Sequence, residues 1–283
     1  MTITYRFYKS PKDLQRQIDF WIAATNQLPF AWKPTLSPNQ FIEQQQFHPK
    51  SRCFAFDGDK IIGYMSFTGS SEFVSLGYPW VLSGYEGEVQ DELYNRIYGF
   101  AVSEAFGAKM FAQRFRSDWT QQIEYFLSKG FAVTRRSSLL VSNLNKTVET
   151  QHDVVVDEGF DFDIWQTMVK KHEDTSAEQF DMMREYYGSV DFDFSIEFDG
   201  GGYFGVTIRQ DTGYAEILAV ACHPNAQNFS DMVEIVMQEC KKRDVKSISM
   251  AAAHVPIKDS LKRLGFTEQT EDVMMMKKSD PTE

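Results

Sequence analysis

The chain has 283 residues, of which 42% are apolar and 14% aromatic, enough for two ordinary domains with well-filled cores. Its formal net charge of −11 argues against nucleic acid as the main partner, because phosphate binding requires clustered Lys and Arg. No stretch approaches the roughly eighteen uninterrupted apolar residues of a membrane span, and no signal peptide is recognisable, so we expect a cytoplasmic protein without a membrane partner.

The cysteines and histidines give no sign of a metal. Cys53, Cys222 and Cys240 are far apart and lack metal-ligand spacing, which indicates reduced thiols. None of the histidines has an HExxH or CxxC companion. The sequence therefore predicts no metal site.

The first half of the chain shows a regular order of elements. The stretch 54–67 (FAFDGDKIIGYMSF) predicts a hairpin around Asp57-Gly58, a pair favoured in two-residue turns. We then expect a long strand over 73–82, a glycine-bearing turn, a helix over 92–106 and a strand over 109–115. The ending FLSKGF closes an amphipathic helix at Gly130, where a positive φ is needed, and a strand follows.

The second half repeats this order. A hairpin is predicted around Asp199-Gly200, and a helix closes at Gly265 in LKRLGF. Between them we expect a strand (YAEILAVAC), a turn (HPNAQNFSD), a helix (MVEIVMQECKKRD) and a strand (KSISMAAA). We interpret this as a duplication, with domains 1–145 and 150–283. The alternative is two unrelated α/β domains that share common turns.

The order of elements, with the Asp-Gly hairpin early and the Gly-Phe ending late, resembles the GNAT (GCN5-related N-acetyltransferase) superfamily in two tandem copies. The resemblance covers nearly the whole chain. It implies a mixed α/β (α+β) fold, each copy having a central, mostly antiparallel sheet flanked by helices, with a splayed fourth and fifth strand. In that family acetyl-CoA lies in the splay, and a turn of pattern Gln/Arg-x-x-Gly-x-Gly/Ala holds its pyrophosphate through backbone N–H groups.

The first turn departs from this pattern. Glu86 stands in place of Gln/Arg, and Val89 and Asp91 replace the two glycines. Together with Glu88, three carboxylates within six residues would repel a pyrophosphate. We therefore expect the first copy to have lost its CoA site.

The second turn matches better. Gln227 fits the first position, Ser230 is a small residue in place of glycine, and Met232 departs from the last Gly/Ala unless its side chain enters the core. Ser230 and Asp231 are equally plausible as the N-cap of the following helix. The resemblance implies an acetyl-CoA site made by two segments: Val220, Ala221 and Cys222 on the strand, then Gln227, Asn228, Phe229, Ser230, Asp231 and Met232.

One residue is a candidate catalyst. Glu216 in YAEI matches the position of a general base in the histone acetyltransferase branch, and amide formation needs such a base. By alternation along a strand we expect it on the same face as Leu218, Val220 and Cys222. The alternative is a structural carboxylate, exposed or paired with a core lysine.

The tyrosine that often protonates the leaving thiolate, four residues before the closing glycine, is replaced by Phe126 and Leu261. The sequence predicts an N-acetyltransferase whose C-terminal copy moves an acetyl group from acetyl-CoA to a primary amine of a small molecule or peptide. A non-catalytic binding or regulatory protein is the first alternative, because both turns are degraded. An aminoacyl-tRNA-dependent transferase is the second, and the lack of basic clusters weighs against it.

Overall fold

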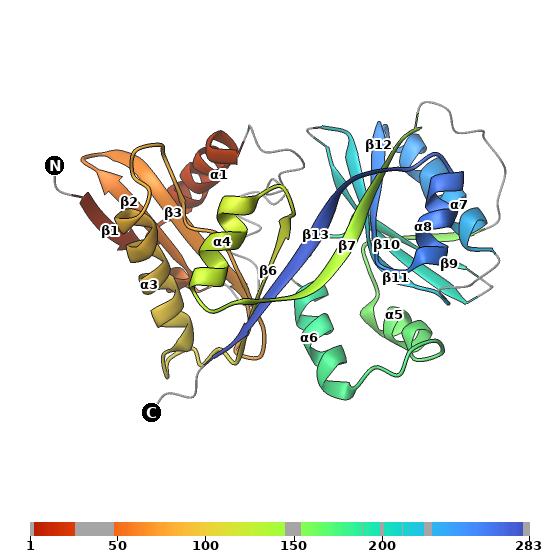
Figure 1. Cartoon of the computed structure of the whole chain (residues 1–283), viewed down its shortest axis with the longest axis horizontal. Helices are drawn as coiled ribbons and strands as arrows, with labels where there is room; N and C mark the ends of the chain where they lie inside the picture. The colour runs from red at the N-terminus through yellow and green to blue at the C-terminus, as the bar shows by residue number, and fades with distance from the viewer. Residues whose placement is uncertain are drawn as a thin grey trace. The chain divides into compact units, whose positions relative to one another are not determined.

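The computed structural model describes residues 3–25, 48–144, 154–188, 190–198, 201–210, 212–223 and 228–279 (Figure 1). The chain divides into two compact units. Unit 1 comprises Met1–Phe115, Trp119–Thr134 and Met274–Glu283, and unit 2 comprises Arg116–Asp118 and Arg135–Val273. Each unit thus includes a short segment from a distant part of the chain. The domains predicted from the sequence, 1–145 and 150–283, stay a prediction, since the units follow packing and not chain order.

The first half of the chain carries the elements expected between its hairpin and its closing glycine. The elements are β1 (Ile3–Phe7), α1 (Pro11–Thr25), η1 (Pro49–Ser51), β2 (Arg52–Asp57), β3 (Lys60–Gly69), β4 (Val74–Leu76), β5 (Trp80–Val81), α3 (Glu88–Val102), β6 (Met110–Arg116), α4 (Thr120–Ser128) and β7 (Ala132–Asn143). The strand predicted over 73–82 is interrupted: β4 and β5 are separated by Gly77 to Pro79. Proline has no N–H to donate, which agrees with a break in the ladder there.

The second half repeats the order. The elements are β8 (Val155–Glu158), α5 (Phe162–Val169), α6 (Ala177–Gly188), β9 (Phe194–Phe198), β10 (Gly202–Arg209), β11 (Tyr214–Ala221), α7 (Phe229–Lys242), β12 (Ser247–Ala252), α8 (Val255–Arg263) and β13 (Thr267–Lys278). The hairpin β9–β10 is present, although its predicted turn residues Asp199 and Gly200 lie outside the described residues.

The duplication is clearest at the two closing glycines. Gly130 and Gly265 have φ of +83° and +86° after α4 and α8. In both copies the glycine N–H bonds to a carbonyl three residues back, and the N–H of the following phenylalanine bonds to one five residues back. This is the double hydrogen bond of a Schellman motif. The predicted role of both glycines is confirmed.

The sheet of unit 2 runs in the order β13-β7-β12-β11-β10-β9-β8, with β11 and β12 parallel and the pairs of β12 with β7, β10 with β11, and β9 with β10 antiparallel. Both faces are covered (Figure 1). One face packs against α7 and α8 through an apolar cluster that includes Val233, Val236 and Leu261. The other packs against α5 and α6 through Trp165, Phe180 and their neighbours. The mixed α/β fold predicted from the sequence is confirmed.

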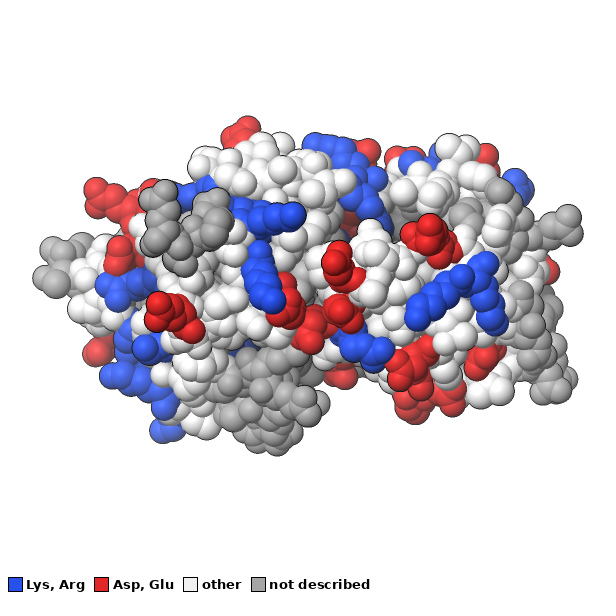
Figure 2. Space-filling model, turned by 90° about the horizontal axis from the view of Figure 1, so that it is seen from below, with Lys and Arg blue, Asp and Glu red and all other residues white. Residues whose placement is uncertain are grey.

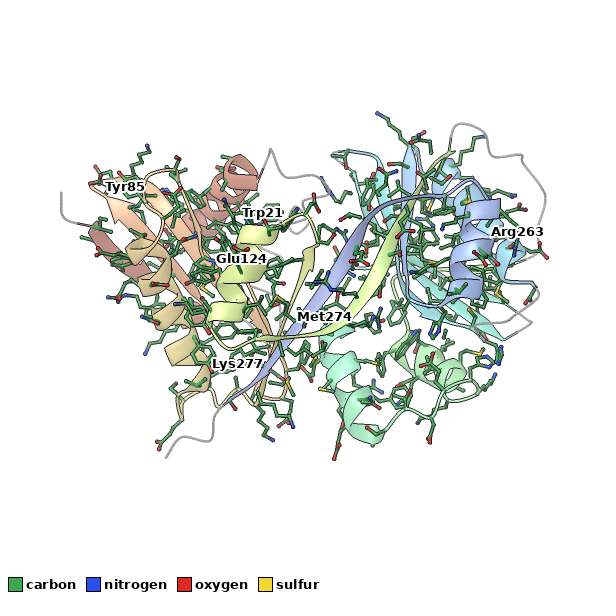
Figure 3. All side chains as sticks on the ribbon, viewed as in Figure 1. Trp21, Tyr85, Glu124, Arg263, Met274 and Lys277 are labelled. Atoms are coloured by element: carbon green, nitrogen blue, oxygen red, sulfur yellow. The ribbon has the colours of Figure 1, made fainter. Side chains whose placement is uncertain are left out.

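Unit 1 has the sheet order β1-β2-β3-β4-β6-β13, with β5 pairing β3 off this path. Its last strand comes from the C-terminal part of the chain, where Ser279 N–H bonds to the carbonyl of Lys109. Lys277 adds a bond from its Nζ to the carbonyl of Lys129, at 3.0 Å (Figure 3). Residues 274–279 are therefore part of the packing of unit 1.

The distribution of charged side chains bears on nucleic-acid binding, and the length and apolar character of the helices bear on membrane insertion. In Figure 2, the Lys/Arg and Asp/Glu side chains of the described residues are interspersed on the face drawn, without a broad cationic area of the kind that binds nucleic acid. Among the described residues no helix combines the length and apolar character needed to cross a bilayer.

Two fragments of the chain test whether unit 2 needs β7 to fold. β12 pairs along its whole length with β7, from Ser247–Asn143 to Ala252–Ser138, and β7 contributes the fully buried Leu139 and Leu140. Burying each leucine is worth about 1.5–3 kcal/mol. We expect fragment 116–283, which keeps β7, to unfold cooperatively on heating, and fragment 150–283, which lacks it, to show no cooperative transition. Equal transitions, measured by circular dichroism, would contradict this.

Candidate active site

The candidate site begins where β11 and β12 separate. The two strands pair in parallel from Tyr214–Ser247 to Ile217–Met250 and no further. β11 continues to Ala221, paired with β10, and β12 continues to Ala252, paired with β7. Beyond Ile217 and Met250, which we call the vertex, the strands therefore diverge. The splay implied by the family resemblance is present in unit 2.

A β-bulge lies at the vertex. Gly205 pairs with Ala219 but Val206 pairs with Ile217, which leaves Leu218 as the extra residue in β11. An extra residue reverses the alternation of side chains beyond it. Consequently Val220 and Cys222 pack in the α7–α8 cluster, whereas Leu218, Ala219 and Ala221 pack on the α5–α6 side.

The face predicted for Glu216 is therefore wrong in part. Ala215 and Ile217 belong to the α7–α8 cluster, so Glu216, between them, points to the α5–α6 side. It shares that side with Leu218 but not with Val220 or Cys222. Simple alternation failed because it assumes an unbroken register.

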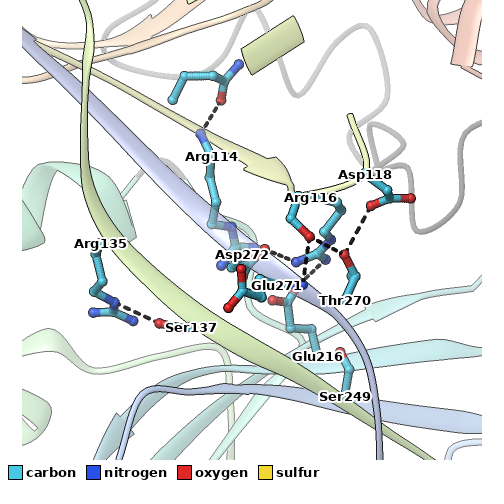
Figure 4. Close-up of polar contacts among 12 residues, drawn as sticks. Arg114, Arg116, Asp118, Arg135, Ser137, Glu216, Ser249, Thr270, Glu271 and Asp272 are labelled. Atoms are coloured by element: carbon cyan, nitrogen blue, oxygen red, sulfur yellow. Dashed lines mark hydrogen bonds and ion pairs between the residues drawn. The ribbon is translucent and has the colours of Figure 1, made fainter. Parts of the chain in front are cut away.

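Glu216 sits in a buried cluster of charges (Figure 4). Its side chain is buried, and Arg116 Nη2 lies 3.9 Å from its Oε2. The same guanidinium is hydrogen-bonded through Nη1 to Asp272 on β13. These three residues, with 1%, 5% and 5% exposure for Arg116, Glu216 and Asp272, form what we call the charge cluster. Burying ions is costly unless they are paired, which the cluster achieves.

Two hydroxyl groups adjoin Glu216. Ser249 on β12 is its partner in the parallel register, so the two side chains emerge on the same face of the sheet. Tyr214 donates from its hydroxyl to Ser249 Oγ at 2.5 Å. Figure 4 shows Ser249 next to Glu216 on the adjacent strand. The vertex of unit 2 thus combines a carboxylate, a guanidinium and a pair of hydroxyl groups.

The predicted pyrophosphate turn leads into α7. The helix begins at Phe229 and its N-cap is Asn228, whose side chain makes no capping hydrogen bond. The alternative N-cap, Ser230 or Asp231, is wrong, since both lie within the first turn. Phe229 and Met232 are buried in the α7–α8 cluster, the condition under which Met232 was expected to be tolerated. Gln227 lies outside the described residues.

The remaining predicted contacts are on β11 and just after it. Val220 is half-buried and Ala221 is buried, and Ala221 pairs with Tyr203 of β10. Cys222 is buried, and desolvation, aided by Glu173, raises the pKa of its thiol to about 12. A thiol with such a pKa is protonated at neutral pH and is a poor nucleophile. This segment can offer backbone groups, but its cysteine is unsuited to covalent catalysis.

The corresponding splay of unit 1 is filled. β4 pairs with β6 only at Val74–Phe111 and Ser75–Ala112, and β5 pairs with β3. Tyr78, between β4 and β5, is buried with its ring 4.8 Å from that of Trp80, 5.5 Å from Tyr125 and 6.4 Å from both Phe115 and Phe126. We call these rings the Tyr78 cluster. Gln90 of α3 donates to the Tyr78 hydroxyl at 2.8 Å, which fixes the ring.

The acidic turn of unit 1 satisfies its own backbone donors. Glu86 accepts from the N–H of Gly84 at 2.7 Å, and Gln90 accepts from the N–H of Gly87 at 3.2 Å. Asp91 is paired with Lys129 at 2.7 Å. Tyr85 fastens the turn to the first hairpin by donating to Asp57 at 2.8 Å (Figure 3). The side chains of the turn thus accept from its own backbone N–H groups and pair its acid with a lysine.

The usual positions of the thiolate acid are apolar and enclosed. Phe126 and Leu261 are both fully buried. Tyr125, next to the first of them, donates to Asp91 at 3.1 Å. Burial, followed by the nearby Asp91 carboxylate, raises the pKa of Tyr125 far above its ordinary value. Neither copy therefore places a conventional acid at this point.

Sequence reasoning missed four residues at the vertex: Arg116, Asp272, Ser249 and Tyr214. Arg116 and Asp272 are 156 positions apart in the chain, and no local pattern links them. Ser249 and Tyr214 lie in segments predicted as strands, and aligning these segments as parallel neighbours is the one signal that relates Ser249 to Glu216.

No protein-family model matches the chain, and no curated protein sequence matches it. Solved structures match over nearly its whole length. A tandem GNAT protein from the clavulanic acid biosynthesis pathway is 13% identical, with a TM-score of 0.66 over 100% of both chains. A GCN5-related N-acetyltransferase from Sphaerobacter thermophilus is 13% identical, with a TM-score of 0.59 over 99% of this chain and 96% of that one.

The N-myristoyltransferase of Saccharomyces cerevisiae, solved with bound myristoyl-CoA, is 8% identical, with a TM-score of 0.60 over 98% of this chain and 79% of that one. At such identities the likeness establishes the fold. The chain has the GNAT fold in two tandem copies, and its structural neighbours include acetyltransferases and other acyltransferases.

The charge cluster generates a stability prediction. Arg116→Met leaves Glu216 and Asp272 buried without the guanidinium, and losing one partner of a buried ion pair costs about 3–5 kcal/mol. Arg136→Met is the matched control, because Arg136 pairs with Glu271 at 3.2 Å on the surface. Exposed pairs are worth about 0–1 kcal/mol. Urea unfolding should separate the two variants clearly, and equal losses would show that the cluster does not stabilise unit 2.

Proposed function

We propose that unit 2 binds acetyl-CoA between β11 and β12 and transfers the acetyl group to a primary amine of a small molecule or peptide. The observation that carries this proposal is the divergence of the two strands beyond Ile217 and Met250, with the bulge at Leu218. A diverging pair leaves backbone groups of β11, from Leu218 to Cys222, facing the gap and not a neighbouring strand. Those groups suit an extended chain containing amides, such as pantetheine.

The bulge suits the chemistry of acyl transfer. An attacking amine turns the thioester carbonyl into an oxyanion, which needs a fixed hydrogen-bond donor. A bulge leaves an unpaired residue at a strongly bent point of the strand, where an N–H is free to point at a ligand. We assign the oxyanion donor to the backbone near Leu218, the extra residue of β11.

The pyrophosphate is assigned to the turn before α7, over Gln227 to Met232. The first N–H groups of a helix have no partners within it, and the helix dipole favours an anion there. Asn228 does not cap these groups with its side chain, and Asp231 is the single acid of the first turn. In the equivalent turn of unit 1, Glu86 accepts a hydrogen bond from the N–H of Gly84. The ring of Tyr78 fills the splay of that unit. The contrast favours unit 2 as the CoA site.

Glu216 is assigned the role of general base. A neutral amine must lose a proton as the new C–N bond forms, and a carboxylate at the vertex can accept it. Arg116 pairs with this carboxylate, and Asp272 holds Arg116 in place by a second ion pair. Unit 1 then has a structural or substrate-shaping role. We further propose a cytoplasmic location, since all three cysteines are buried thiols.

A non-catalytic binding protein is the second candidate. The fully buried Leu261 favours it, because the position that often supplies the thiolate acid has no proton to give. The pairing of Glu216 with Arg116 also agrees with a structural carboxylate. An acetyltransferase must bind acetyl-CoA and turn it over, whereas degraded turns predict weak or no acetyl-CoA binding for the non-catalytic protein, so a titration with acetyl-CoA separates the two candidates.

Acetyl-CoA binding can be tested with a pair of tryptophan variants. Ser230→Trp places a bulky ring in the first turn of α7, and Glu88→Trp places one in the first turn of α3, where Glu88 is exposed. A ligand at 100 times its Kd adds about 2.7 kcal/mol of stability, visible as a rise in melting temperature. We expect acetyl-CoA to stabilise the wild type and Glu88→Trp but not Ser230→Trp. Loss of the effect in Glu88→Trp alone would move the site to unit 1.

The role of Glu216 is tested by Glu216→Gln. Glutamine keeps the shape but accepts no proton, so we expect acetyl transfer to amines to fall by about 10²- to 10⁴-fold. Acetyl-CoA affinity, measured by calorimetry, should stay nearly unchanged. A purely structural Glu216 predicts the reverse, a lower melting temperature with full turnover in the folded protein.

A further inference from the structure

Transfer of an acetyl group from a thioester releases a thiolate, which is helped by a proton donor. The two positions where a tyrosine would be expected hold Phe126 and Leu261, both enclosed in apolar surroundings. A side chain that protonates the thiolate in unit 2 is therefore not at the usual position. The charge cluster contains an acceptor, Glu216, so the donor has to be a separate group.

We infer that Ser249, backed by Tyr214, is the proton donor to the leaving thiolate in unit 2; this rests on the proposed function. Ser249 is 0% exposed and precedes Met250, the last residue of β12 that pairs with β11. Its register partner is Glu216, the candidate base. Donor and acceptor thus flank the point where the strands part, on the same face of the sheet.

The hydrogen bonds around Ser249 suit a relay. Its Oγ accepts from the Tyr214 hydroxyl at 2.5 Å, a short bond between two neutral groups. Its own hydrogen is directed to the carbonyl of Ala215 at 3.4 Å, which is a weak contact. The Ser249 hydroxyl is therefore not tied to a strong acceptor, and the tyrosine hydrogen is in place to replace the serine proton as it moves, so that no serine alkoxide forms.

The proposed step balances as follows. The amine nitrogen forms a bond to the thioester carbonyl carbon and its proton passes to Glu216. The C–S bond breaks, and its electron pair goes to sulfur. As the Ser249 proton passes to sulfur, the Tyr214 proton passes to Ser249. The half-buried Tyr214 then takes a proton from water, and Glu216 returns the amine proton to water, so all three side chains regain their starting forms. Ser249 is the catalytic residue of this relay, and Tyr214 acts through it.

The test compares two thioester donors. Acetyl-CoA releases an alkyl thiolate, which benefits from protonation, whereas an S-acetyl nitrothiophenol releases a much weaker base that needs none. We expect Tyr214→Phe and Ser249→Ala to lower the rate with acetyl-CoA on the order of 10²-fold and to stay within about twofold of the wild type with the aryl donor. A loss that depends on the leaving group is not produced by a merely structural role.

Tyr203→Phe is the matched control. Tyr203 on β10 is buried; its hydroxyl donates to a serine, Ser195, at 2.8 Å and accepts from the N–H of Asp161 at 2.8 Å. Removing its hydroxyl deletes the same kind of Tyr–Ser bond in the same sheet. We expect equal rates relative to the wild type with both donors. Melting temperatures of all variants identify any that are unfolded, and the conservative Tyr214→Phe decides alone if Ser249→Ala does not fold.

The outcomes separate this inference from the proposed function. Suppose that the wild type turns over and that Tyr214→Phe is either unimpaired or impaired equally with both donors. This result overturns the relay and leaves the proposed acetyltransferase function in place. A wild type that neither binds acetyl-CoA nor releases thiol overturns the proposed function, and the relay with it. A loss with acetyl-CoA that disappears with the aryl donor supports both.

Discussion

The separation of β11 from β12 after Ile217 and Met250 is the constraint on which the candidate site depends. Two parallel strands normally exchange hydrogen bonds along their shared length, so a gap must be maintained by partners on the outer sides. Here β10 holds β11 and β7 holds β12 beyond the vertex. The bulge at Leu218 bends β11, and beyond it each side chain lies on the opposite face of the sheet from the one that simple alternation predicts. The backbone of β11 in this gap is the part to which we assign the ligand.

The two copies show how one fold keeps or loses such a gap. In unit 1 the ring of Tyr78 occupies the splay, and Gln90 holds it by a hydrogen bond from α3. Aromatic rings bury large areas, so a filled splay stabilises the unit while excluding a ligand. The turn beyond it is closed by Glu86 on the N–H of Gly84. In unit 2 the vertex is lined by polar groups instead.

Those polar groups come from distant parts of the chain. Arg116 is the last residue of β6 and Asp272 lies in the middle of β13, yet both belong to unit 2. A buried guanidinium between two carboxylates is worth little as net stability, but removing it would leave uncompensated charge. The Arg116 guanidinium instead fixes the orientation of Glu216 beside Ser249 and Tyr214. The stability of unit 2 and the chemistry proposed for it thus depend on the same residues.

The sequence by itself determined the features that depend on near neighbours. The repeat, the hairpins, the closing Gly130 and Gly265 and the acidic first turn all follow from short patterns, because turns, caps and local charge are decided within a few residues. Only the tertiary structure decided the rest. One extra residue at Leu218 reversed the faces of β11, and this was visible only in its pairing with β10. The charge cluster, the Tyr214–Ser249 pair and the Tyr78 cluster depend on contacts between strands and helices far apart in the chain, which no local period encodes.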